Sequence, residues 1–242
     1  IYTSTGMAKG VYITGNLYMQ PGREIRSRGP TNASKGGDTA ETGIYQESKI
    51  KSGNPLIVEG DTSADTNPMP SYCSVDLAEL DDPTKYDKVV YDSYMNYESN
   101  ETFDLAGKVH KFTQGVRFSS NITFTGAGTI WVSGGSGHSY GLELCSNVFG
   151  PDGGYASVNL IVSGGTWNLA DIMINSNVKI NGLISGTTQV NANSNVAING
   201  VIESGGTVNV NSNVTIQWGQ LGFQIPITGS PAATVVRSWR EL

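Results

Sequence analysis

An 18-residue internal repeat in the C-terminal third is the feature that most constrains the fold of this chain. The segments SNVKINGLISGTTQVNAN (176–193) and SNVAINGVIESGGTVNVN (194–211) align without gaps, and SNVTIQWG (212–219) begins a third copy. Val178, Val196 and Val214 therefore occupy equivalent positions. A repeat of this length is typical of a chain that winds into stacked coils, each of which buries its apolar side against its neighbours.

Within the repeat, aliphatic residues also recur every six positions. One series runs through Val178, Ile184, Val190, Val196, Ile202, Val208 and Val214. A second inward series lies two residues later, at Val162, Ile174, Ile180, Ala192, Ile198, Val210 and Ile216. Alternation over three residues followed by a polar or glycine corner predicts a short strand and a turn. Three such units in each copy of the repeat predict one triangular coil of a parallel β-solenoid, an all-β fold.

Asparagine recurs at the corners of the predicted coils. We expect one ladder at Asn175, Asn193 and Asn211, and another at Asn159, Asn177, Asn195 and Asn213. Stacked asparagine amides can hydrogen-bond along the axis of a coil stack. These side chains therefore have a structural role in the prediction.

The rest of the chain divides by its pattern. Residues 1–25 contain GVYITGNLYMQPGREI (10–25) and read as the first solenoid strands, whereas 26–104 reads as a long, irregular and acidic insertion packed on the solenoid. Residues 105–219 read as the solenoid coils, and NITFTGAGTIWVSGG (121–135) resembles one of them. Residues 220–242, with Pro226 and Pro231, read as a C-terminal cap over the last open coil.

Composition limits the possible partners. Charged residues make up 15% of the chain, the net charge is −6 and the pI is near 4.9. That balance argues against binding nucleic acid over the whole surface. Cys73 and Cys145 lack metal-ligand spacing, so they are either one disulfide of an exported protein or two separately buried thiols.

Catalytic chemistry has little support in the sequence. The two histidines, His110 and His138, lie in no nucleophile or metal motif, and the regular coils offer only Asp171 and Glu203 as outward carboxylates. We therefore expect no catalytic residues, no metal site and no cofactor. A β-helix polysaccharide lyase or hydrolase remains the enzymatic alternative. Ice binding would need ladders of threonine, whereas one outward series reads Lys179, Ala197 and Thr215.

Two sets of side chains are candidate binding patches. Aromatic residues that could bind a sugar or a surface are Tyr91, Tyr94, Tyr97, Trp131 and Tyr140. Basic residues that could bind DNA are Lys9, Arg23, Arg26, Arg28 and Lys35. Core packing of the irregular insertion on the solenoid is the alternative interpretation of the whole first set.

Three segments carry a family resemblance: GVYITGNLYMQPG (10–22), NITFTGAGTIWVSGG (121–135) and VVRSWREL (235–242). Their order resembles that of PilX-like type IV minor pilins with a β-solenoid head. The resemblance implies an extracellular head on a pilus, other pilin subunits as partners, and membrane attachment only through an N-terminal helix that these residues do not include. It implies a non-enzymatic role in adhesion or pilus-tip assembly, with a surface glycan or extracellular DNA as ligand. A pilus-tip DNA receptor for uptake is the alternative.

Overall fold

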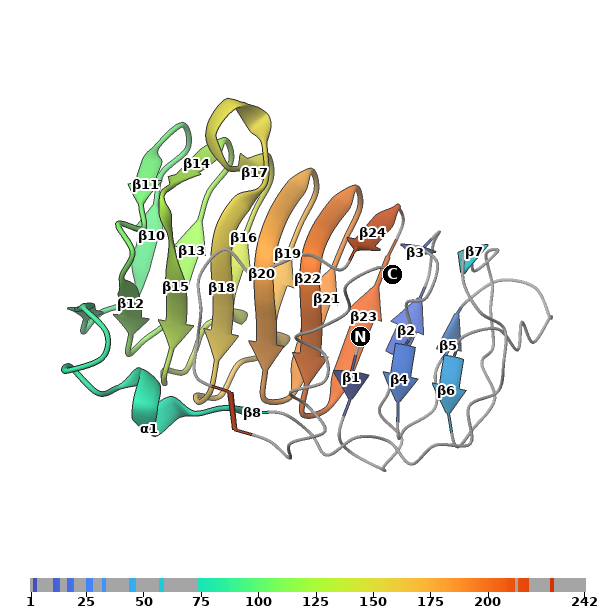
Figure 1. Cartoon of the computed structure of the whole chain (residues 1–242), viewed down its shortest axis with the longest axis horizontal. Coiled ribbons are helices and arrows are strands. Elements are labelled where there is room, and N and C mark those ends of the chain that lie inside the picture. The colour runs from blue at the N-terminus through green and yellow to red at the C-terminus, as the bar shows by residue number, and fades with distance from the viewer. Residues whose placement is uncertain are drawn as a thin grey trace, which may run out of the picture.

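The computed structural model describes residues 75–211 and 213–216 in full, and only the backbone of Ser74, Gln217 and short strands within 2–58 and 227–228. The described chain winds into a rod of stacked coils (Figure 1). Its neighbouring strands pair in parallel, for example β20 (Val178–Gly186) with β22 (Val196–Ser204). The predicted parallel β-solenoid is confirmed at this level.

Two rows of strands form the long faces of the rod. The first sheet contains β9 (Lys88–Tyr91), β12 (Val109–Phe112), β15 (Ala127–Val132), β18 (Ala156–Val162), β20 and β22. The second sheet contains β10 (Met95–Tyr97), β13 (Val116–Phe118), β16 (Tyr140–Leu144), β19 (Ala170–Ile174), β21 (Gln189–Ala192) and β23 (Thr207–Val210). In Figure 1 the first sheet faces the viewer and the second lies behind it.

A third, shorter row closes each coil along the upper edge in Figure 1. It contains β11 (Thr102–Asp104), β14 (Ile122–Thr125), β17 (Val148–Phe149), the first halves of β20 and β22, and β24 (Val214–Gln217). Between β17 and β18 lies the short 3-10 helix η1 (Pro151–Gly153). The coils differ in length. Val148 pairs with Val178, and Val178 pairs with Val196, so the second coil uses fewer residues than the first.

The core is a stack of inward side chains, because alternate residues of each strand point into the rod. In the repeats these are the predicted valines and isoleucines, such as Val196 and Ile198. Towards β9 the stack becomes aromatic. Tyr91 stacks on Phe112 with ring centroids 4.4 Å apart, and Tyr97 stacks on Phe118 at 4.8 Å.

Asparagines at one corner form a ladder. Asn100, Asn121, Asn147, Asn177, Asn195 and Asn213 all have φ between 55° and 69°. This left-handed conformation suits asparagine better than most residues, which explains its recurrence here. Side-chain amides link successive coils, with the Asn177 Nδ2 atom donating to the Asn147 Oδ1 atom at 3.0 Å. Similar bonds join Asn121 to Asn100 and Asn213 to Asn195.

Asn159 lies outside that ladder, contrary to the prediction. It is buried on the outer side of the first sheet, where its amide donates to the Thr129 hydroxyl at 3.3 Å and accepts from the Leu183 N–H at 2.9 Å. The 18-residue repeat places Asn159 one coil before Asn177, but that coil is longer than the repeat, so Asn147 occupies the equivalent position. The second ladder runs along the same turns, two residues earlier in the chain, where Asn193 donates to Asn175 at 2.7 Å and Asn211 donates to Asn193.

The N-terminal strands continue the rod beyond the last repeat. Strands β1 (Tyr2–Thr3), β2 (Val11–Ile13) and β3 (Leu17–Met19) pair in parallel with β22, β23 and β24, respectively. The row extends through β4 (Ile25–Ser27), β5 (Asn32–Ala33), β6 (Ile44–Gln46) and β7 (Ile57–Val58). These strands are therefore placed after the final coil in space, although they come first in sequence.

The predicted irregular insertion at 26–104 is wrong for much of its length. Strands β4 to β7 lie within it and pair with neighbouring strands, and β9 to β11 form a coil of their own that stacks on β12 to β14. The pattern failed there because this coil carries tyrosine and threonine in place of the hexad aliphatics. Of the described residues in this range, 74–87 cross the outside of the rod.

Residues 74–87, called the cover segment below, contain β8 (Ser74–Val75) and α1 (Leu77–Leu80). The Asp76 side chain caps the helix by accepting from the Glu79 N–H at 2.9 Å. Leu80 is fully buried against the outer side of the first sheet, in a second apolar cluster with Trp131 and Ile161. β25 (Ile227–Thr228) pairs antiparallel with β8, and the rest of the predicted cap at 220–242 lies outside the described residues.

Candidate functional site

Three aromatic side chains gather where the loops of the first sheet enter the second sheet. Tyr94, His138 and Trp167, called the aromatic corner below, come from the loops between β9 and β10, between β15 and β16, and between β18 and β19. The rings of Tyr94 and His138 stack with centroids 3.7 Å apart and an interplanar angle of 16°. Each of the three side chains is half-buried, so their rings retain contact with solvent.

Glycines make room for Trp167. A Cβ atom at Gly165 would lie 2.5 Å from the Trp167 Cζ2 atom, and one at Gly141 would lie 2.7 Å from its Cε2 atom. A Cβ atom at Gly115 would lie 3.2 Å from the Trp167 Cη2 atom and 3.3 Å from the Tyr94 Cδ2 atom. The two rings therefore flank the same glycine. Contact with backbone atoms fixes the orientation of the Trp167 indole.

A polar row lies beside the aromatic corner on the outer face of the second sheet. The Arg117 Nε atom donates to the Glu143 Oε2 atom at 3.0 Å, an ion pair between side chains that are 40% and 18% exposed. The Asn175 amide donates to the other oxygen of Glu143 at 3.4 Å, and an Arg117 nitrogen donates to the Asn96 Oδ1 atom at 3.4 Å. Register places Asn96, Arg117 and Glu143 side by side on β10, β13 and β16.

The aromatic corner and the polar row are electrostatically coupled. Burial raises the pKa of Tyr94 above its ordinary value, and the nearby Glu143 carboxylate raises it further. Burial also raises the pKa of Tyr140, with Glu143 again as the nearby charge. Both hydroxyls therefore stay protonated at neutral pH and can donate hydrogen bonds. This face offers aromatic surface, hydroxyls, amides and carboxylates within a small area, since the exposed Glu98 accepts from the Asn96 amide at 2.8 Å beside the Arg117–Glu143 pair.

Cys145 lies next in the same outer face, two residues after Glu143. It is a buried free thiol, and burial raises its pKa, which makes it a poor nucleophile at neutral pH. The candidate bridge to Cys73 is not formed at Cys145, and Cys73 itself lies outside the described residues.

The predicted aromatic patch does not form one surface. Tyr91 and Tyr97 pack on the core, where the Tyr91 hydroxyl lies 3.2 Å from the Nδ1 atom of the buried His110. Trp131 is 4% exposed on the outer side of the first sheet, with its indole N–H donating to Ser163 at 2.7 Å. Of the predicted set, Tyr94 and Tyr140 border the polar row.

Sequence reasoning missed Trp167 and His138. Both lie in loops that make their coils longer than the repeat, so the repeat gave no register for them. Glycine was the sequence signal that could have located them, because Gly135, Gly141 and Gly165 lie in or next to these loops.

The basic patch cannot be placed in the same way. The side chains of Lys9, Arg23, Arg26, Arg28 and Lys35 lie outside the described residues, although Arg26 belongs to β4.

The two outward carboxylates of the repeats are buried. Asp171 is 2% exposed and accepts hydrogen bonds from the Thr187 hydroxyl and from the N–H groups of Thr188 and Gln189, so it ties a corner together. Glu203 is 6% exposed, and burial raises its pKa to about 7 despite a 2.6 Å hydrogen bond from Ser185. Neither is free for general acid chemistry on the surface.

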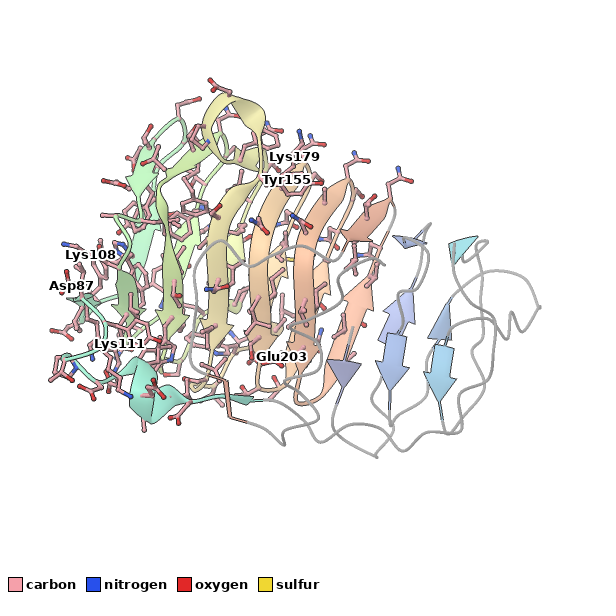
Figure 2. The ribbon with its side chains drawn as sticks, in the orientation of Figure 1. Asp87, Lys108, Lys111, Tyr155, Lys179 and Glu203 are labelled. Atoms are coloured by element: carbon pink, nitrogen blue, oxygen red, sulfur yellow. The ribbon has the colours of Figure 1, made fainter. Side chains whose placement is uncertain are left out.

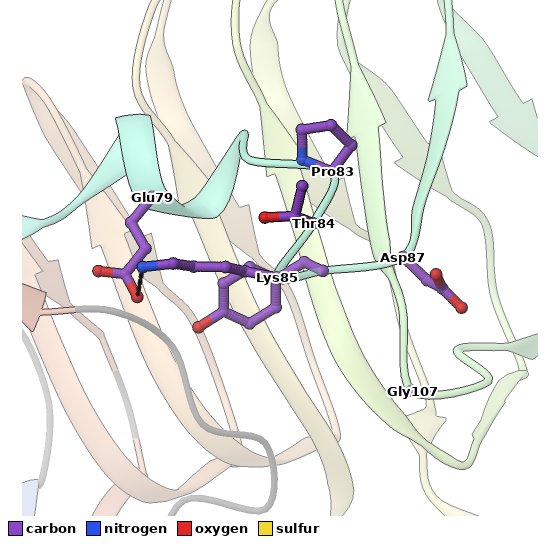
Figure 3. A pocket seen from close by; sticks show the side chains of 7 residues that line it. Glu79, Pro83, Thr84, Lys85, Asp87 and Gly107 are labelled. Atoms are coloured by element: carbon purple, nitrogen blue, oxygen red, sulfur yellow. Dashed lines mark ion pairs between the residues drawn. The ribbon is translucent and has the colours of Figure 1, made fainter.

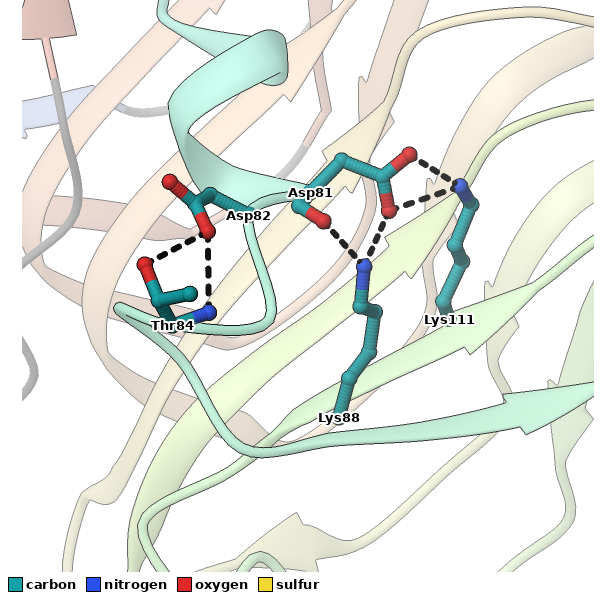
Figure 4. A network of polar contacts seen from close by, with 5 residues as sticks. All are labelled: Asp81, Asp82, Thr84, Lys88 and Lys111. Atoms are coloured by element: carbon teal, nitrogen blue, oxygen red, sulfur yellow. Dashed lines mark hydrogen bonds and ion pairs between the residues drawn. The ribbon is translucent and has the colours of Figure 1, made fainter.

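Ion pairs hold the cover segment on the first sheet. Figure 4 shows Asp81 between Lys88 and Lys111, and the Lys111 ammonium lies 2.9 Å from the Asp81 Oδ2 atom. The same ammonium lies 4.3 Å from the ring centroid of Trp131. In Figure 2 Lys111 projects from the first sheet towards the helix. These contacts give the network a structural role, because they attach the cover segment to the first sheet.

A hollow beside the cover segment does not contain a reactive group. It is lined by Glu79, Pro83, Thr84, Lys85, Tyr86, Asp87 and Gly107, as Figure 3 shows. Glu79 and Lys85 form an ion pair of 3.0 Å within it, between side chains that are well exposed to solvent. An ion pair exposed in this way contributes little interaction energy.

Within residues 74–211 and 213–217, no cluster of three or more histidine, cysteine or acidic side chains could hold a metal ion. None of the helices in that part of the chain has the length and apolar character to cross a bilayer.

Comparisons with known proteins leave the family open. No protein-family model matches the sequence, and a search of curated proteins finds no significant match. Among solved structures, the chain is similar to LeIBP, an ice-binding protein from an Arctic yeast, with 13% identity and a TM-score of 0.31. That similarity covers 89% of this chain and 92% of the other. A TM-score this low carries no conclusion about function.

Proposed function

We propose that this chain is the non-enzymatic head domain of an exported, pilin-like protein and that it adheres to a surface through the aromatic corner. The observation that carries the proposal is the position of Trp167. A half-buried indole packed against glycine backbone, beside the stacked Tyr94 and His138, presents aromatic surface in a fixed orientation. Aromatic side chains with a polar tip are typical of binding surfaces, because they bury apolar area while keeping a hydrogen-bonding group.

The rod suits adhesion because it is stiff. Each coil pairs with the next through backbone hydrogen bonds, and amide ladders tie the corners at Asn175, Asn193 and Asn211. A binding face built on such a sheet loses little ordering entropy when it meets a ligand.

The charges support a binding role over a lyase or hydrolase. Glycoside hydrolysis needs two carboxyl groups that flank the substrate. On the described outer face of the second sheet, Glu143 is paired with Arg117 and Asp171 is buried in a corner. Glu98 also lies on that face, where it accepts a hydrogen bond from the Asn96 amide at 2.8 Å. Each of these three carboxylates therefore has a partner within the protein.

The resemblance to PilX-like minor pilins supplies the cellular setting of the proposal. It gives an extracellular location on a pilus, other pilin subunits as partners and a role at the pilus tip. DNA uptake is the alternative function, carried by the basic residues near Arg26, and it predicts binding that weakens steeply with salt.

Beads coated with the purified chain test adhesion directly. We expect them to bind bacterial or host cell surfaces, and we expect Trp167→Ala to remove most of the binding. The matched control is Tyr155→Ala. Tyr155 is 39% exposed and lies at the opposite, upper edge in Figure 2. Equal loss in both variants, or binding only to duplex DNA, would contradict the proposal.

A further inference from the structure

We infer that the aromatic corner and the adjoining Arg117–Glu143 pair form a binding site for a neutral hexopyranose unit of a surface polysaccharide. This inference rests on the adhesive function proposed above and names the class of ligand. It needs apolar contact for one face of the sugar ring, polar groups for the hydroxyls and a charge distribution that does not attract an acidic sugar. Each requirement is met by particular residues.

The apolar contact comes from the aromatic corner. A pyranose presents a face of C–H groups that packs on an aromatic ring. Trp167 and Tyr94 both lie beside Gly115, within 3.3 Å of a Cβ atom placed there, and His138 stacks on Tyr94, so the three rings lie close together. A side chain at Gly115 would crowd both rings, so the glycine there lets Trp167 and Tyr94 approach each other.

The polar contacts come from the next residues of the second sheet. Ligand sites combine apolar lining with a few placed polar groups that fix orientation. Glu143 supplies carboxylate oxygens, Arg117 supplies guanidinium N–H groups, and Asn96 and Asn175 supply amides. The Tyr94 hydroxyl stays protonated beside Glu143. Sugar hydroxyls both donate and accept, and this row offers both kinds of partner.

The charges of the row disfavour an acidic sugar. Arg117 and Glu143 are paired at 3.0 Å, so their charges offset each other, and the exposed Glu98, which accepts from the Asn96 amide at 2.8 Å, adds a negative charge to the row. A uronic acid would have to displace Glu143 from Arg117 to gain an ion pair, and an amino sugar would have to displace Arg117 from Glu143. A neutral hexopyranose can hydrogen-bond to both without breaking the pair.

The test is isothermal titration calorimetry of the whole chain with cellohexaose, mannohexaose and maltohexaose as neutral probes, and trigalacturonate as the acidic one. We expect at least one neutral probe to bind more tightly than trigalacturonate. We expect Trp167→Ala and Tyr94→Ser each to weaken that binding by about tenfold or more, the scale of one lost aromatic contact. Tyr155→Ala should leave the affinity unchanged. The second aromatic variant keeps the test valid if Trp167→Ala does not fold, which circular dichroism reports.

The inference is overturned if none of the neutral probes binds at millimolar concentration, if trigalacturonate binds best, or if both aromatic variants bind like the native chain. The calorimetry and the bead assay test the sugar ligand and the adhesive function separately. If beads adhere through Trp167 but the neutral probes do not bind, the ligand class is wrong and the adhesive function stands. If the beads do not adhere at all while a neutral probe binds through Trp167, the sugar site stands and adhesion is wrong.

Discussion

Glu203 offers a sharp test of the packing on the outer side of the first sheet. Its carboxyl group is 6% exposed, its neighbour in register is Ser185, and burial raises its pKa from the ordinary 4.5 to about 7. The unfolded chain therefore releases this proton near pH 4.5, whereas the folded chain keeps it until about pH 7. Between these pH values deprotonation stabilises the unfolded state but not the folded one. The free energy of unfolding therefore falls as pH rises through this window and levels off above it.

The magnitude follows from the rise in pKa. A change from 4.5 to about 7 corresponds to about 3 kcal/mol at pH 8 and close to zero at pH 4. Glu203→Gln removes the titration but keeps the side-chain size and an oxygen that accepts from Ser185. The free energy of unfolding of the variant minus that of the native protein should therefore rise by about 3 kcal/mol from pH 4 to pH 8.

Urea unfolding of both proteins at the two pH values gives the difference. Any constant packing effect of the substitution cancels, because it is the same at both pH values. A stability difference that does not change with pH would show that Glu203 is ionised in the folded protein. It would refute the burial of this carboxyl group.

Three further predictions test other contacts. Asp81→Asn removes the ion pairs with Lys88 and Lys111 from a carboxylate that is 43% exposed, so we expect a loss of about 1 kcal/mol or less at pH 7 that disappears at acid pH, read from urea unfolding. The pKa of Asp81 is lowered, first by its hydrogen bond to Lys88, so its contribution is present above the unfolded pKa and lost as pH falls through the folded one. Gly200→Ala places a Cβ atom 2.0 Å from a backbone oxygen of the neighbouring coil and should cost about 1–3 kcal/mol or more, seen as a lower melting temperature; an unchanged Tm would contradict the stacking of these coils. Val196→Asp puts a charge into the fully packed core and should cost several kcal/mol, and an unchanged circular dichroism melt would show the register to be wrong.

The regular coils were predictable because their signal is local. Hexad spacing placed Val178, Val196 and Val214 in one inward stack, and the structure pairs Val178 with Val196 directly. Corner asparagines were predictable for the same reason, since the left-handed corner recurs at each coil. Asn159 shows the limit of this reasoning. Once a loop lengthens a coil, a fixed offset assigns the wrong partner, and Asn147 takes the place that the repeat gave to Asn159.

The remaining elements depend on contacts between distant residues. Tyr2 pairs in register with Glu203, and no periodic pattern connects two strands so far apart in the chain. The burial of Glu203 was missed because alternation identifies the outer side of a strand but not whether another segment lies over it. For Trp131 the sequence left a surface patch and packing under the insertion open for the same reason, and the structure shows the packing, because the cover segment lies against it. Trp167 was missed because it lies in a loop that lengthens its coil, where it packs on glycine backbone and against the edge of the core outside the repeat register.

The most direct test of the proposed binding face is site-specific photo-crosslinking during adhesion. A benzophenone amino acid replaces Tyr94 in one protein and Tyr155 in another, and each is illuminated while bound to cells. We predict crosslinks to the cell surface from position 94, on the aromatic corner, and few from position 155, at the opposite edge. Equal crosslinking from both positions, or crosslinking from position 155 alone, would contradict the assignment of the aromatic corner as the binding face.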